Sequence, residues 1–341
     1  MDSQTAGVLP TLPATTARHG TAATRRRFTR MVERIIEGGV KLTAMSAIVV
    51  IFLIFVFVGK EALPLLWQHP EPGLEHEAVT LDNLIGPTQY PDRPSRFVWQ
   101  PVSNVPKYNL LPLIVGTLKT TVIAILFAGP LAILAAILSS ELAPRWLREI
   151  VKPTIELLAG IPSVVLGFFA LIVLASWLQQ MLGLRIRLNA LNAGIALGLA
   201  VIPIIFTVAE DALTTVPKSY REASLALGAN RWETAIKVVL PAALPGIFAG
   251  VVLGFGRAVG ETMVVLMASG NAATTTPWVT DSVRTLSATV AAELGEVVFG
   301  SPHYRVLFLI GVILFVFTFA VNLCGDLYVQ RLKQRLEGGR A

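Results

Sequence analysis

Two charged residues lie inside an otherwise apolar stretch, and their types and spacing could bind an anion. Arg257 and Glu261 fall within residues 243–268. In a helix, residues four apart share a face one turn apart, so this carboxylate and this guanidinium can pair. A charge at the centre of a spanning helix costs about 2.5 to 3.5 kcal/mol and therefore usually faces a partner or a pathway. With Thr262 beside them, these residues predict an anion path, and a purely structural ion pair is the alternative.

Small residues run beside this pair at four-residue spacing. They are Gly246, Gly250, Gly254, Ala258 and Thr262. Such a stripe lets a second helix approach closely. It predicts a span that packs tightly on one side and presents Arg257 on the adjoining side.

Other polar residues give weaker signals. Lys119 lies inside an apolar run and could snorkel outward, and acidic residues near helix ends are expected to be solvated or to cap helices: Glu156, Glu210 and Asp211. The four histidines do not have metal-ligand spacing, and no Gly-x-x-x-x-Gly-Lys-Ser/Thr loop is present to bind nucleotide phosphates. We therefore expect no metal, no cofactor and no catalytic residue in this chain.

The composition indicates what positions these residues. The chain has 341 residues, of which 54% are hydrophobic and only 15% charged, whereas soluble domains carry about 25% charge. Six apolar segments are long enough to cross a bilayer, which takes about 20 helical residues. Lipid leaves backbone groups no partner outside the segment, so we expect an all-α membrane protein. The segments are residues 42–66, 112–138, 153–178, 191–213, 243–268 and 304–328.

Lysine and arginine are unevenly distributed between the two sides of these spans. With the N-terminus inside, the inner segments hold 18 of the 28 and the outer segments 8, which predicts that both termini are cytoplasmic. Five parts are expected, namely a basic tail (1–41) that is largely disordered and can become helical from about Phe28, a first transmembrane helix (42–66), an external Pro-rich loop (67–111), a five-helix core (112–328) and a C-terminal tail (329–341). A second external stretch, 269–303, is expected to dip back into the protein.

The longest inner connection, residues 214–241, has a patterned sequence. It predicts a short helix, a left-handed cap at Gly228 and a second amphipathic helix that Pro241 closes at the next span. We expect a rigid projection from the membrane.

This connection resembles the signature of permease subunits of bacterial ABC importers. The signature reads Glu-Ala-Ala, three residues, Gly, nine residues, Ile-x-Leu-Pro, and the matching positions are Glu222, Ala223, Gly228, Leu240 and Pro241, while Ser224 and Val238 depart from it. The resemblance implies a type I importer permease fold and docking of the connection into an ATPase subunit. ATP and Mg would then be bound by that separate polypeptide.

Further strings resemble the phosphate-specific subfamily, PstC type. They are Leu111 to Leu118, Ile155 to Val165 and Gly256 to Met263, followed by Gly270-Asn271. This resemblance implies phosphate as substrate, the bacterial inner membrane as location, and as partners a PstA-type permease, two PstB-type ATPases and a PstS-type binding protein.

Three alternatives remain open at this point. A permease for sulfate, molybdate or an organic solute fits the same physics, because a guanidinium fork serves any oxyanion. A secondary transporter would show inverted repeats, and a membrane-embedded enzyme would show clustered His, Asp or Glu on facing spans. We see neither feature in the sequence.

Overall fold

A computed structural model describes residues 19–67, 79, 81–90, 93–103 and 105–338. The chain divides into two units, one ending at Phe57 and the other beginning at Val58. Helix α1 (His19–Ala62) contains the first candidate span, Glu33–Ala62. The predicted tail lies outside the described residues up to residue 18, and the chain is helical from His19, which is earlier than the expected start near Phe28. No proline interrupts residues 19 to 62, so the helix continues into the basic segment.

The second unit is built mainly of helices, and the prediction of six spans is confirmed. The five spans after α1 are Leu111–Leu142, Ser163–Leu182, Ala190–Thr215, Arg231–Gly260 and Pro302–Leu332. The helices are α2 (Pro64–Trp67), α3 (Leu81–Ile85), α4 (Leu111–Ile137), α5 (Arg145–Ala159), α6 (Ser163–Phe169), α7 (Ala175–Leu182), α8 (Ala190–Thr215), α9 (Lys218–Ala226), α10 (Arg231–Thr234), α11 (Leu240–Gly260), α12 (Met263–Ala268), α13 (Leu286–Glu293) and α14 (Pro302–Gly338). Three π-helical turns are η1 (Leu138–Leu142), η2 (Ala170–Leu174) and η3 (Ala235–Val239).

The third span begins later than the apolar segment 153–178 from which it was predicted. Helix α5 ends at Ala159, and α6 begins at Ser163. Pro162 explains the break, because proline has no N–H to donate and disfavours the helical conformation in the residue before it, Ile161. An unbroken helical path long and apolar enough to span therefore begins at Ser163.

Helix α8 lies at the centre of the hydrophobic core and packs against α4 and α11. The glycine stripe on α11 makes this contact. A Cβ on Gly254 would lie 2.7 Å from Ile205 Cγ1, and one on Gly246 would lie 2.4 Å from Ala212 Cβ. The predicted close approach on one side of α11 is thus confirmed, and glycine is required there because the α8 side chains fill the space.

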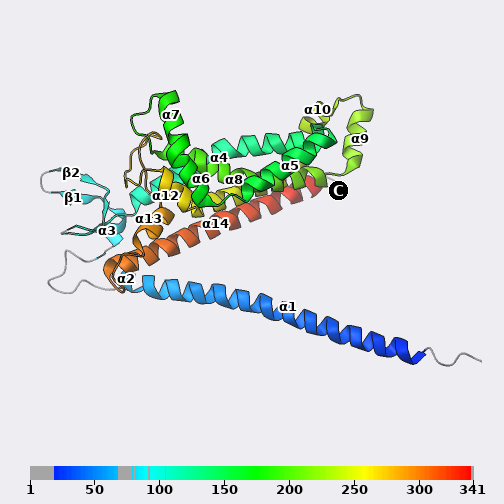
Figure 1. Cartoon of the computed structure of the whole chain (residues 1–341), viewed down its shortest axis with the longest axis horizontal. Helices are drawn as coiled ribbons and strands as arrows, with labels where there is room; N and C mark the ends of the chain where they lie inside the picture. Colours follow the sequence, from blue (N-terminus) through cyan, green and yellow to red (C-terminus); the bar gives the residue numbers. More distant parts are fainter. Residues whose placement is uncertain (1–18, 68–78, 80, 91–92, 104, 339–341) are drawn as a thin grey trace, which may run out of the picture. The chain divides into compact units, whose positions relative to one another are not determined.

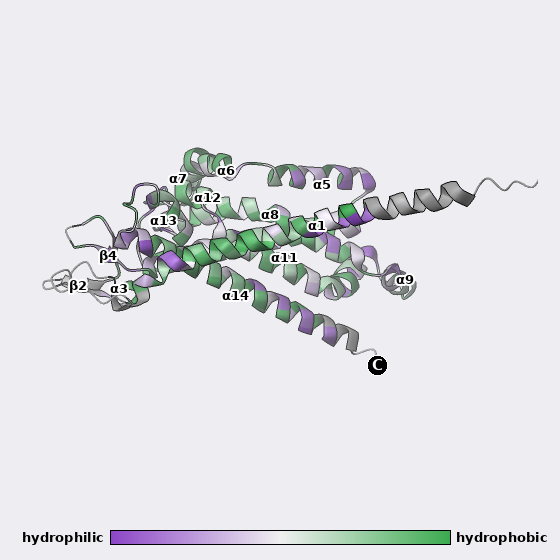
Figure 2. Ribbon diagram, turned by 90° about the horizontal axis from the view of Figure 1, so that it is seen from below, coloured by the Kyte–Doolittle hydropathy of each residue, from purple (hydrophilic) through white to green (hydrophobic). Residues whose placement is uncertain are grey.

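Helix α14 packs on α11 and α13. Hydrophobic residues cover most of its length, and polar residues become frequent toward its C-terminal turns (Figure 2). Helix α5 instead carries hydrophobic and polar residues on different faces, and none of its side chains is fully buried.

Short elements gather at one end of the bundle, opposite α9 and α10 (Figure 1). Strands β1 (Thr88–Tyr90) and β2 (Arg93–Arg96) pair antiparallel, as do β3 (Trp99–Gln100) and β4 (Lys107–Tyr108). Trp99 and Tyr108 join a second hydrophobic cluster with α13 and α14 residues. We call the end that carries α9 and α10 the inner end and the opposite end the outer end, after the predicted orientation.

Candidate functional site

Arg257 lies in the last turn of α11, and its side chain is exposed. It has no hydrogen-bond or ion-pair partner among the residues that the structure describes. A charge in an apolar span is costly unless something outside its own helix receives it. The side chain is therefore available to water, to an anion or to another subunit.

The predicted pairing of Arg257 with Glu261 is wrong. Helix α11 ends at Gly260, and Glu261 has an extended backbone with ψ of 132°, so the two residues do not share a helical face. The Glu261 carboxylate instead accepts from the backbone N–H of Thr262 at 3.2 Å. The hydroxyl of Ser287 on α13 donates to the Glu261 carbonyl at 2.8 Å, which satisfies a group that the helix break leaves free. The tertiary contact with α13 explains the break that local sequence did not signal.

Thr262 follows this break and lines an open groove of about 560 Å³. The groove lies between the end of α11, α13 and α14, and its lining residues are Gly260, Thr262, Ser287, Val290, Ala291, Leu294, Gly295, Gly311 and Leu314. The hydroxyls of Thr262 and Ser287 are the polar side chains in this lining. The three predicted residues thus fall on consecutive parts of one segment, although Glu261 has a different role from the one expected.

The 214–241 connection forms the predicted rigid projection. Helix α9 presents Glu222 and Ala223 at the surface, and Gly228 has φ of +89°, which confirms the predicted left-handed cap. Helix α10 begins with a capping box in which the Asn230 side chain accepts from the Glu233 N–H and Glu233 accepts from the Asn230 N–H. These local bonds fix the path of the chain between the two helices.

The second half of the connection does not end at Pro241. Leu240 and Pro241 occupy the first turn of α11, directly after the π-helical turn η3, and α10, η3 and α11 form one helical path from Arg231 to Gly260. The prediction that proline closes this helix is therefore wrong. The connection continues directly into the span that carries Arg257.

A bidentate ion pair joins the connection to the end of α4. Arg221 on α9 donates from Nη2 to Glu141 Oε1 at 2.6 Å and from Nε to Glu141 Oε2 at 3.0 Å. The side chains are 21% and 9% exposed. Hydrogen bonding to Glu141 raises the pKa of Arg221 above its usual value. Sequence reasoning missed this pair, because 80 residues separate its members.

A buried carboxylate lies close by on α8. Glu210 is 3% exposed, accepts from the Ser139 hydroxyl at 2.9 Å and lies 2.9 Å from Lys152 Nζ on α5. The hydrogen bond to Glu210 raises the pKa of Lys152. The expectation of a solvated or capping role for Glu210 is wrong, because α4 and α5 cover this turn of α8.

A second carboxylate, Glu293, is partly buried at the outer end and contacts several polar side chains. Glu293 on α13 accepts from Arg284 Nη1 at 2.6 Å and from Trp99 Nε1 at 3.1 Å, and lies 2.8 Å from His303 Nε2. Burial opposes ionisation of Glu293, but the hydrogen bonds from His303 and Trp99 and the charge of Arg284 outweigh it and lower the pKa.

Buried residues support the prediction that the 269–303 stretch dips back into the protein. Val283 and Ala288 are fully buried, and the Leu286 N–H donates to Thr117 Oγ1 on α4 at 3.0 Å. Lys119, expected to snorkel, instead donates to the carbonyls of Thr276 and Trp278. The outer segment is thereby fastened to α4.

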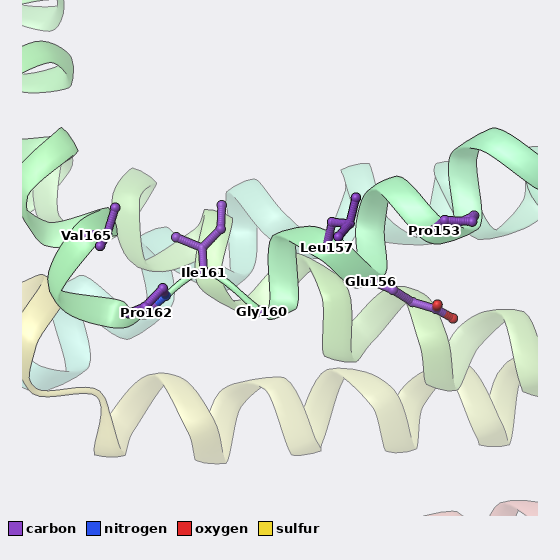
Figure 3. Close-up of a pocket in the computed structure, with 7 residues that line it drawn as sticks. All are labelled: Pro153, Glu156, Leu157, Gly160, Ile161, Pro162 and Val165. Carbon is purple, nitrogen blue, oxygen red and sulfur yellow. The ribbon is translucent and has the colours of Figure 1, made fainter.

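A second open groove of about 710 Å³ follows the break between α5 and α6 (Figure 3). Its lining is mostly apolar, with one carboxylate, and consists of Pro153, Glu156, Leu157, Gly160, Ile161, Pro162 and Val165. All of these lining residues come from one continuous stretch, so residues of α5, α6 and the break between them form the groove within the described part of the chain.

Comparison with known proteins identifies the fold and the family. The family described as "Binding-protein-dependent transport system inner membrane component" matches residues 128–338. The "Probable ABC transporter permease protein YqgH" of Bacillus subtilis is 39% identical over 221 residues, which are 65% of this chain and 72% of the relative. The "Phosphate transport system permease protein PstC" of Xylella fastidiosa (strain 9a5c) is 36% identical over 257 residues, which are 70% of this chain and 78% of the relative.

Two solved structures share the fold at lower identity. A chain of a bacterial alginate ABC transporter superposes with a TM-score of 0.55 at 17% identity and covers 89% of this chain and 98% of its own length. A chain of the MetNI methionine ABC transporter superposes with a TM-score of 0.52 at 20% identity and covers 65% of this chain and 97% of its own length. The predicted importer permease fold is confirmed.

These findings also fix the class of protein. Members of the family are the membrane-spanning components of ABC importers rather than their nucleotide-binding subunits, and they work with an ATPase, a second permease and a binding protein. The six apolar helices accord with a multi-pass protein of the inner membrane. The chain belongs to the binding-protein-dependent transport system inner membrane components and, among them, to the PstC-type permeases.

Proposed function

We propose that this chain forms half of the translocation pathway of an ATP-driven phosphate importer. The observation that carries the proposal is Arg257, an unpaired guanidinium in a spanning helix of a chain similar to PstC proteins. Phosphate carries one to two negative charges, and its transfer from water is prohibitive without fixed donors. Arginine supplies five donors in a planar fork that matches phosphate oxygens.

The proposed path runs from the outer groove at Thr262 to Arg257. Gly260 and Thr262 line that groove, and Arg257 lies about one turn further along the same segment. The Glu261 carboxylate is held by the Thr262 N–H and so does not neutralise the arginine. An arriving anion therefore finds the positive charge unpaired.

The proposed coupling surface is the 214–241 connection at the inner end. Leu227 and Trp232 are 89% and 55% exposed there, beside Glu222 and Ala223. Exposed apolar side chains at the tip of a rigid projection suit a protein partner better than water. The proposed partners are two PstB-type ATPases at this end, a PstA-type permease beside the spans and a PstS-type binding protein at the outer end, with both termini cytoplasmic.

Reconstitution tests this function. The chain would be co-expressed with a second permease, an ATPase and a phosphate-binding protein, and the purified complex would be placed in liposomes with ATP inside. We expect uptake of radiolabelled phosphate that requires both ATP and the binding protein and that excess sulfate or molybdate does not inhibit. Uptake by this chain without an ATPase would refute the importer, and equal inhibition by sulfate would refute phosphate as substrate.

A further inference from the structure

We propose that the Arg221–Glu141 pair is the link through which movement of the 214–241 connection reaches α4 and α8. The proposal rests on the coupling role proposed above and assigns positioning residues to it. The connection has two attachments to the spans, and they differ in construction. One is a continuous helix, and the other is a joint that needs a side chain to hold it.

The joint lies between α8 and α9. Helix α8 ends at Thr215, and the next two residues, Val216 and Pro217, have extended backbones with ψ of 129° and 138°. Pro217 has no N–H with which to continue the α8 hydrogen-bond ladder. Two extended residues alone would let α9 pivot on the end of α8.

Arg221 spans this joint. Its Nη2 donates to the carbonyl of Leu213 at 2.8 Å, and its Nη1 donates to the carbonyl of Val216 at 2.5 Å. The same guanidinium holds both oxygens of Glu141 in η1. One planar group thus fixes α9 to the C-terminal end of α8 and to the end of α4. A lysine ammonium has no planar fork to reach all these acceptors in one geometry.

The turn that carries Glu141 is itself tied to its surroundings. Ser139 in the same turn donates to Glu210 on α8, and its carbonyl accepts from Arg148 Nε on α5 at 2.7 Å. A displacement of Glu141 therefore cannot be absorbed by local loosening of η1. It is passed to the helices on either side.

The bidentate geometry of the Arg221–Glu141 pair also suits a positioning role. Burying an ion pair contributes little net stability compared with packed apolar residues, but it fixes one geometry. Arg221 immediately precedes Glu222, the exposed residue of the proposed docking surface. A force applied to Glu222 thus acts on the same helical turn that the guanidinium clamps.

On its other side the connection needs no such clamp. Residues Arg231 to Gly260 form one helical path, so movement there reaches Arg257 directly. Loss of the Arg221–Glu141 pair should therefore leave the movement of α11 intact and weaken the movement transmitted to α4 and α8. The complex would hydrolyse ATP with reduced transport.

The test measures phosphate taken up per ATP hydrolysed in the reconstituted four-component complex. We compare Glu141→Gln, Arg221→Gln and the double variant Arg221→Met/Glu141→Leu, which leaves no unpaired buried charge. Arg221→Lys and Glu141→Asp are the conservative variants. Lys41→Gln is the matched control, since it removes an exposed lysine–glutamate pair within α1 that holds no other element.

We expect the ratio to fall about tenfold in the two glutamine variants and in the double variant. The conservative variants should recover part of it, and Lys41→Gln should keep the wild-type ratio. If the double variant assembles and keeps the wild-type ratio, the pair is structural and the inference is wrong. If wild-type uptake proves independent of ATP, the proposed function fails first, so the two failures are distinguishable.

Discussion

The inner and outer ends of the bundle each hold a loop with an arginine–carboxylate pair at 2.6 Å, but with different companions. At the inner end, the Arg221 guanidinium donates hydrogen bonds to two backbone carbonyls and to the Glu141 carboxylate. At the outer end, Glu293 is shared by Arg284, Trp99 and His303. The outer cluster thus combines one carboxylate with an arginine, a tryptophan and a histidine, whereas the inner one depends on a single arginine that stays charged.

This difference separates two tasks. The inner pair bridges a two-residue joint beside the proposed ATPase contact, where the proposed coupling needs one fixed geometry. The outer cluster ties β3, α13 and α14 into a frame around the groove at Thr262. Damage at the inner end should impair coupling, and damage at the outer end should impair stability.

The largest effect expected from the inner end is that of Gly228→Val. A Cβ at Gly228 would meet no neighbouring atom, so the cost comes from φ of +89°, which a β-branched residue rarely adopts. We expect intact membrane insertion, loss of phosphate uptake and loss of stimulated ATP hydrolysis. Gly59→Val is the matched control, because Gly59 also has open space around its Cβ but is helical. Wild-type uptake and ATPase stimulation in Gly228→Val would show that the connection does not dock as proposed.

A smaller effect of another kind is expected from Glu293→Gln. This change leaves Arg284 and His303 without their carboxylate, and breaking such a pair costs on the order of 3 kcal/mol. The unfolding temperature of the detergent-solubilised protein should fall, while phosphate uptake per ATP in the surviving complex stays at the wild-type value. A lowered ratio with unchanged unfolding temperature would reverse the roles that we assign to the two ends.

The smallest effect is the pH dependence of the outer cluster. The pKa of Glu293 is lower folded than unfolded, so its contribution to stability is complete above the unfolded value of about 4.3 and disappears as the pH falls through the folded value. Unfolding temperatures of wild type and Glu293→Gln, measured from pH 7 downward, should converge in this acidic range. Curves that stay parallel throughout it would contradict the assignment to Glu293.

Features encoded by local pattern were predictable from the sequence. Apolar length gave the six spans, and the motif at Glu222 marked the projection with its glycine in the left-handed region. The four-residue glycine spacing correctly indicated which side of α11 packs closely, because helical periodicity places those residues on one face.

Features that depend on distant contacts were not predictable. The break at Glu261 depends on Ser287, which lies 26 residues away, and the Arg221–Glu141 pair joins residues 80 apart. Glu210 reads as a solvated residue near a helix end until α4 and α5 are seen to cover it. The local spacing of residues does not predict these contacts, because they arise from the packing of helices that are distant in the sequence.

The central claim, that Arg257 carries the anion, is tested most directly by the initial rate of phosphate uptake in liposomes containing equal amounts of assembled complex. The account predicts no uptake for Arg257→Ala and impaired uptake for Arg257→Lys, which keeps the charge but loses the fork. Glu261→Gln should have a weaker effect than either, because this carboxylate holds the Thr262 N–H and is not paired with the arginine. Wild-type uptake by a normally assembled Arg257→Ala complex would contradict the account and remove the anion path from α11.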